Sequence, residues 1–195
     1  MELKLSTLLL VTAIAAAGCF NEPEPAYKSV PAENRVYLSD KGLKAVPEVN
    51  SKADYLNLDR NQLEKADGVE KLTELKWLRL NDNKLATLPD LKGLVKLRRI
   101  YLRNNGFEAV PETLKDLPAL TDIDLSGNPV KEVPQWLAEK KGLKNLSFSR
   151  TKVTKLPANL EAWTSLQCLQ LGDLNISPTE MARIRSALPN VAIVF

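Results

Sequence analysis

Residues 97–119 read L-R-R-I-Y-L-R-N-N-G-F-E-A-V-P-E-T-L-K-D-L-P-A. In this stretch Ile100 and Leu102 are apolar, and one position that faces the other side separates them. Asn105 follows, and after it Val110-Pro111. Such alternation is typical of a short β-strand with one buried face. The proline starts a return path because it has no backbone N–H to donate to a sheet. The stretch therefore predicts one strand, one turn and one return path.

The same pattern recurs along most of the chain with a period of about 22 residues. Segments begin at Glu33, Ala53, Leu75, Leu97, Leu120, Leu143, Leu166 and Leu188. Their fourth and sixth positions are apolar throughout, ending with Val191 and Ile193. A unit of this size buries its apolar face only against a neighbouring copy, so the repetition predicts a stacked solenoid with a parallel sheet.

The segments resemble the leucine-rich repeat, L-x-x-L-x-L-x-x-N-x-L, over about five-sixths of the chain. The resemblance implies an α/β horseshoe: a right-handed solenoid over residues 33–195 with about seven and a half repeats. A parallel sheet is expected on its concave face, with short helices and 3-10 turns on its convex face. Eight strands at a spacing of ~4.8 Å would span ~34 Å.

Asparagine at position nine of the repeat is expected to be structural. The residues are Asn61, Asn83, Asn105 and Asn128. An asparagine where the chain leaves the strand satisfies backbone groups that the bend leaves unpaired, and the family resemblance implies that these side chains form a ladder. Lys41, Thr151 and Leu174 occupy the same position, so the ladder should be imperfect at both ends.

The end of the chain predicts a helix and a closing strand. Ser177-Pro178-Thr179-Glu180 has the pattern of a capping box with proline at the first helical position. Met181 and Ile184 would then face the core, and residues 191–195 would form the last strand.

Residues 1–18 predict a signal peptide. Lys4 is followed by an uncharged run over residues 5–17, shorter than the ~20 residues of a membrane-spanning helix. The run leads to Ala16-Ala17-Gly18-Cys19. This resembles the lipobox of bacterial lipoproteins, although Ala16 stands where leucine is more common. The resemblance implies that Cys19 becomes the N-terminus and carries a diacylglyceryl thioether.

Residues 19–32 are predicted to be the lipidated cysteine and an extended linker. Pro23, Pro25 and Pro31 favour an extended chain, and residues 20–32 would reach ~40 Å at ~3.1 Å per residue. In the sorting rule that this region resembles, aspartate after the cysteine retains a lipoprotein at the inner membrane. Phe20 stands there instead, so we expect an outer-membrane anchor, with the domain facing either the periplasm or the exterior.

Composition argues against several classes of function. Net charge is +3, from 27 basic and 24 acidic residues, so no concentrated basic excess predicts nucleic-acid binding. Histidine, the commonest general base and metal ligand, does not occur in the sequence. Cys19 and Cys168 are too few for a disulfide framework. We therefore predict no enzymatic activity, no cofactor and no metal site.

One pair of carboxylates leaves an alternative to consider. Asp122 and Asp124 lie two residues apart on a predicted strand and so share a face, and paired carboxylates can perform acid–base chemistry. Both occupy surface columns of the repeat, where solvated polar side chains are expected. Catalysis there is the less favoured interpretation.

Positions three, five and seven of each repeat are predicted to point to the concave face. In the first four repeats they carry aromatic and basic residues: Arg35, Tyr37, Tyr55, Trp77, Arg79, Arg99, Tyr101 and Arg103. These residue types dominate binding hot spots, and an exposed Trp77 would be costly on an inert surface. The alternative is that neighbouring repeats stack these side chains to stabilise the sheet.

The sequence thus predicts a monomeric, lipid-anchored module that binds a protein partner at the bacterial cell envelope. The alternative ligand is an anionic envelope glycan held by Arg79, Arg99 and Arg103. Salt would separate the two, because binding of a polyanion weakens steeply as ionic strength rises.

Overall fold

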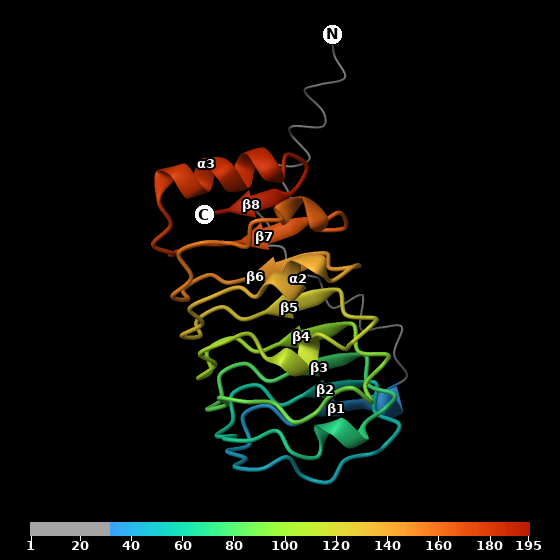
Figure 1. Cartoon of the computed structure of the whole chain (residues 1–195). Coiled ribbons are helices and arrows are strands. Elements are labelled where there is room, and N and C mark those ends of the chain that lie inside the picture. Colours follow the sequence, from blue (N-terminus) through green and yellow to red (C-terminus); the bar gives the residue numbers. More distant parts are fainter. Residues whose placement is uncertain (1–31) are drawn as a thin grey trace, which may run out of the picture.

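The computed structural model describes residues 32–195, which form one parallel sheet of eight three-residue strands. The strands are β1 Arg35–Tyr37, β2 Tyr55–Asn57, β3 Trp77–Arg79, β4 Arg99–Tyr101, β5 Asp122–Asp124, β6 Asn145–Ser147, β7 Cys168–Gln170 and β8 Ala192–Val194. Their order in the sheet is their order in the sequence, so the repeats stack one on the next (Figure 1). The predicted leucine-rich-repeat solenoid is confirmed.

The core is a column of leucines that runs through the stack. Strand pairing places equivalent residues opposite one another, as Leu56 opposite Leu78 and Ile100 opposite Ile123. These side chains are fully buried, as are the residues at position six of repeats two to seven, such as Leu58, whereas Leu38 in the first repeat is partly buried. Since burial of a leucine stabilises by about 1.5–3 kcal/mol, each repeat depends on its neighbour for most of its stability.

Five return paths contain a helix or a 3-10 turn. These are η3 Val69–Lys71, η4 Glu112–Leu114, α2 Gln135–Glu139, η5 Leu160–Ala162 and α3 Pro178–Ala187, while η2 Ala32–Asn34 precedes β1. Their leucines Leu114, Leu137 and Leu160 are fully buried. Among residues 32–195, no helix is long and apolar enough to cross a membrane.

Each of the first seven repeats turns off its strand through a left-handed residue at position eight. The residues are Asp40, Arg60, Asp82, Asn104, Gly127, Arg150 and Asp173, with φ between 52° and 70°. Glycine, asparagine and aspartate tolerate this conformation best. Arg60 and Arg150 are exceptions, and for such residues it costs about 1–2 kcal/mol.

The four asparagines at position nine form a hydrogen-bonded ladder between repeats. Asn105 is representative: its Oδ1 accepts from the N–H of Leu85 at 3.0 Å, and its Nδ2 donates to the carbonyls of Leu80 at 2.9 Å and Leu102 at 3.0 Å. Asn61, Asn83 and Asn128 make the equivalent bonds. Each amide therefore closes backbone groups of two adjacent repeats.

The last repeat is longer than the sequence pattern predicts. Ser177 caps α3, its Oγ accepting from the N–H of Glu180 at 3.2 Å. The helix that follows delays the strand, and Ile193 rather than Val191 pairs with Leu169. The predicted alignment, with Val191 at position four and Ile193 at position six, is therefore wrong by two residues. The cause is the ten-residue helix α3, which replaces the shorter turns of the other repeats.

Glu180 does not complete the capping box but clamps α3 to the preceding repeat. Its Oε1 accepts from the N–H of Leu156 at 2.9 Å, and both carboxylate oxygens accept from Arg183 at 2.8 Å. Arg183 in turn donates to the carbonyl of Leu156 at 2.9 Å. The hydrogen bonds from Arg183 hold the pKa of Glu180 below its ordinary value. A charged clamp thus joins α3, the red helix in Figure 1, to the preceding repeat.

The asparagine ladder predicts a stability difference between two alanine variants. Asn105→Ala should lower the free energy of unfolding by roughly 1–3 kcal/mol, because it leaves buried backbone groups without partners. The exposed Lys65→Ala should change it by less than about 0.5 kcal/mol. Urea unfolding of both variants checks this, and equal midpoints would show that the ladder is not structural.

The Glu180 clamp predicts a pH-dependent stability. Because the pKa of Glu180 is lowered in the folded state from 4.5, its contribution is present above pH 4.5 and is lost as the pH falls through the folded-state pKa. Glu180→Gln should therefore melt below the wild type at pH 7, and the gap should close as the pH falls below 4.5. Exposed Glu64→Gln is the control. A gap that persists in acid would mean that the charge of Glu180 does not matter.

Candidate partner-binding face

The structure brings the eight predicted site residues together on one face of β1–β4. Their side chains differ widely in exposure to solvent. Tyr37 is 57% exposed, whereas Tyr55, Trp77 and Tyr101 are 3%, 8% and 6% exposed. The expectation of an exposed Trp77 is wrong, since neighbouring strands place a tyrosine ring and a guanidinium against its ring.

Side chains at position three form a continuous row across the sheet. The ring of Tyr55 meets that of Trp77 edge-on, with centroids 6.1 Å apart. The guanidinium of Arg99 lies 4.9 Å from the centroid of Trp77 on the next strand, and its Nε lies 3.8 Å from the carboxylate of Asp122. The row goes on through a 2.6 Å hydrogen bond from Asn145 to Asp122. Arg99 is thus held from both sides, with its side chain 15% exposed.

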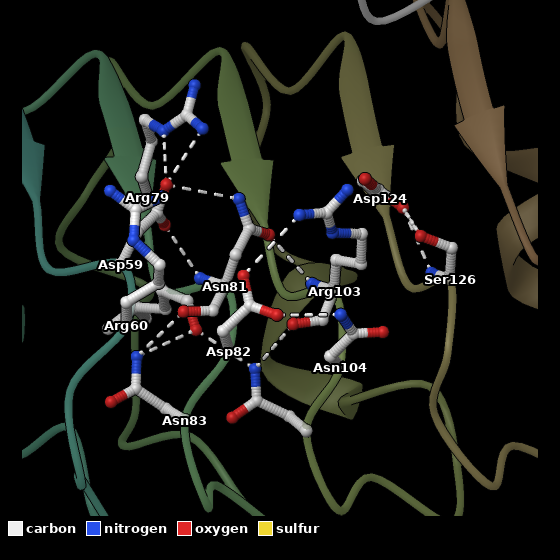
Figure 2. A network of polar contacts seen from close by, with 12 residues as sticks. Asp59, Arg60, Arg79, Asn81, Asp82, Asn83, Arg103, Asn104, Asp124 and Ser126 are labelled. Carbon is white, nitrogen blue, oxygen red and sulfur yellow. Dashed lines mark hydrogen bonds and ion pairs between the residues drawn. The ribbon is translucent and has the colours of Figure 1, made fainter.

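Arg79 is held in the same manner one column away. Its guanidinium lies 5.2 Å from the ring centroid of Tyr101. Its NH2 and Nε contact the carboxylate of Asp59 at 2.7 Å and 2.8 Å (Figure 2). Cation–π contacts contribute about 0.5–2 kcal/mol, so the stacking that we considered as an alternative is present. The side chain nevertheless keeps 30% of its surface exposed.

A second polar ladder, missed in the sequence, joins residues at position seven. Asp59 Oδ1 accepts from the N–H of Asn81 at 2.8 Å, and Asn81 Oδ1 accepts from the N–H of Arg103 at 2.8 Å (Figure 2). Within their own repeats, Asn57 and Asp124 accept from the N–H of the position-seven residue instead. The residue type changes from repeat to repeat, so only the recurrence of short polar side chains in this column could have indicated it.

Arg103 is the most exposed arginine of the strand columns in repeats two to four. Its NH2 lies 3.4 Å from Asp82, and its side chain is 46% exposed. Asn104 donates to the same carboxylate at 2.6 Å. Exposed ion pairs of this kind contribute little to stability, so Arg103 is available to a ligand at small cost.

The two carboxylates considered for catalysis are occupied by neighbours. Asp122 accepts from Thr121 as well as from Asn145. Asp124 accepts from the backbone and hydroxyl of Ser126 at 2.9 Å and 2.6 Å. Burial raises the pKa of Asp124, and the hydrogen bonds from Ser126 oppose that shift. Within residues 32–195, no group of three or more acidic or cysteine side chains is arranged to hold a metal ion.

Cys168 lies in β7, is 1% exposed and is disulfide-bonded. The sequence contains one other cysteine, Cys19, which lies outside the described residues together with the predicted signal peptide and most of the linker. A sulfur that carries a lipid thioether cannot also form a disulfide. Any test of lipidation at Cys19 must therefore follow both cysteines.

Comparison with known proteins defines the class to which this solenoid corresponds. Residues 73–130 match the family profile of the leucine-rich repeat. Outside that span the repeat pattern rests on the sheet register and the asparagine ladder described above. Residues 73–130 are thus similar to the leucine-rich-repeat family, and residues 32–195 have the fold of a leucine-rich-repeat solenoid.

Similar proteins come from animals and from a bacterium. Keratocan of Danio rerio is 32% identical over 87 residues, 42% of this chain and 25% of keratocan, and that of Bos taurus is 35% identical over 85 residues, 40% and 24%. A solved leucine-rich-repeat protein of Leptospira interrogans has a TM-score of 0.63 and 27% identity, covering 78% of this chain and 46% of that one. The chain thus matches about a quarter of the keratocans and about half of the bacterial protein.

Proposed function

We propose that this chain is a binding module that recognises a protein partner at the cell envelope through the concave face of its first four repeats. The observation that carries the proposal is the pair of partly exposed arginines, Arg79 and Arg99, each fixed between an aromatic ring and a carboxylate on neighbouring strands. Leucine-rich-repeat proteins typically bind proteins, which supports this class of function.

Fixed arginines favour specific contacts. A free arginine loses rotamer freedom when it is captured at an interface, at a cost of about 0.5–1.5 kcal/mol. Arg79 has already lost that freedom in the folded chain, because Asp59 and Tyr101 hold it. The buried rings of Trp77 and Tyr101 would then act as supports, while Tyr37, Arg79 and Arg103 offer the exposed surface.

The anionic-glycan alternative is less well supported by the same contacts. Arg79, Arg99 and Arg103 each lie within 4 Å of a carboxylate, from Asp59, Asp122 and Asp82. Those carboxylates offset the positive charge that would attract a polyanion. A partner that offers a carbonyl, an aromatic face or a single carboxylate fits this surface better.

We also propose that a lipid on Cys19 anchors the domain to the outer membrane, as a monomer facing the periplasm or the exterior. The support is the position of Cys19 directly after an uncharged run and small residues. A multi-chain anchor holds firmly where a single acyl chain binds only marginally.

Binding is tested by site-specific photo-crosslinking in whole cells. A photoreactive residue at Tyr37 should give one adduct of defined mass, whereas one at Val95, 53% exposed on a return path, should not. In the Tyr37 background, Arg79→Ala and Arg103→Ala should each lower the yield at least about fivefold, equivalent to about 1 kcal/mol. Gln170→Ala, on the same face of β7, should leave it unchanged. If both arginine variants give the full crosslinking yield and their circular dichroism is unchanged, the partner does not bind through these arginines.

Lipidation is tested by metabolic labelling with a fatty acid. Cys19→Ser should abolish the label and release the protein from membranes, because the thioether sulfur is gone. Cys168→Ser is the matched control and should keep the label. If the wild-type protein carries no label and its electrophoretic mobility changes on reduction, Cys19 forms a disulfide and does not carry the lipid anchor.

A further inference from the structure

Basic side chains line the edge of the sheet at which the strands begin. Position two of the repeat carries Lys76, Arg98 and Lys144, all exposed. The backbone at this position forms one ladder: Arg98 donates to Lys76, Thr121 to Arg98 and Lys144 to Thr121, each at 2.8 Å. The three cations therefore stand in one line across repeats three to six, with Thr121 filling the gap.

The return paths that lead to this edge add to its charge. Residues 69–76, 91–98, 114–121 and 137–144 contain nine basic and four acidic residues. Their balance of +5 exceeds the +3 of the whole chain. The positive excess of the protein is thus concentrated on this side of repeats two to six.

Most of these cations are not neutralised within the described part of the chain. Lys76 lies 3.3 Å from Asp54, Lys92 lies 2.8 Å from Asp90, and Lys96 lies 2.6 Å from Glu74. Arg98, Lys141 and Lys144 form no ion pair with any residue between 32 and 195. This differs from the concave face, where the arginines of repeats two to four have carboxylate partners.

We propose that a basic flank, formed by Lys76, Arg98, Lys115, Lys141 and Lys144, binds the phosphate headgroups of an anionic membrane surface. Like charges side by side on a sheet are destabilising, and a dense layer of phosphates relieves that repulsion. The inference rests on the proposed lipid anchor, which brings the domain to a membrane. A basic patch beside a lipid is a known second membrane signal, and here it would orient the solenoid with this edge toward the bilayer.

The experiment uses the full chain with Cys19→Ser, so that no lipid contributes to binding. The protein should sediment with phosphatidylglycerol vesicles and not with phosphatidylcholine vesicles, and added salt should release it. The triple change Arg98→Gln, Lys141→Gln and Lys144→Gln should weaken binding by at least about tenfold. A control with the same change in net charge, Lys44→Gln, Lys65→Gln and Lys84→Gln, alters exposed lysines of other columns and should bind like the parent protein.

Three results would overturn the inference. The first is equal loss in both triple variants, which would show an effect of net charge alone. The second is equal binding to both kinds of vesicle. The third is soluble polyphosphate bound as tightly as the vesicles and lost in the same variant, which would make the flank a site for soluble polyanions. Fatty-acid labelling of Cys19 is measured separately from vesicle binding. A negative result with vesicles therefore does not contradict the lipid anchor, and the absence of labelling contradicts the anchor without any vesicle experiment.

Discussion

The structure depends on hydrogen bonds to the backbone N–H and C=O groups at the ends of very short strands. A three-residue strand pairs only a few N–H and C=O groups, and the chain turns away at once through a left-handed residue. Groups left unpaired beside a leucine core would each cost about 1–3 kcal/mol. The ladder through Asn105 and the ladder through Asn81 remove that cost repeat by repeat. Leucine burial can then stabilise the stack.

The polar network also decides what the concave face can offer. Asp59 accepts from the backbone of Asn81 with one oxygen and binds the guanidinium of Arg79 with the other. One carboxylate therefore satisfies a backbone N–H group and also fixes an arginine that stays partly exposed. Stacking and binding, which the sequence presents as alternatives, are compatible here, because the contacts that stabilise the sheet also fix the groups that remain partly exposed.

The sequence predicted the features that recur in every repeat and missed the contacts and lengths that differ from one repeat to the next. The strands of the first seven repeats lie where the period places them, because every repeat must bury the same apolar pair. Val191 fails as a position-four residue because the length of α3, and not the period, sets the last strand. Trp77 was expected at the surface because its column is outward-facing. The sequence of one strand does not reveal that the next supplies Arg99 to cover its ring.

Charge is distributed over the solenoid in two different ways. On the concave face, Arg79 and Arg99 lie beside carboxylates, so a ligand there gains from geometry more than from attraction. On the flank, Arg98 and Lys144 have no such partners among residues 32–195, and the gain would come from attraction. Long-range electrostatic attraction acts on anionic groups in general, whereas hydrogen-bond donors held in fixed positions discriminate among partners. A module held at an anionic surface by one edge could thus keep its selective face for a protein, because the two interactions use different side chains.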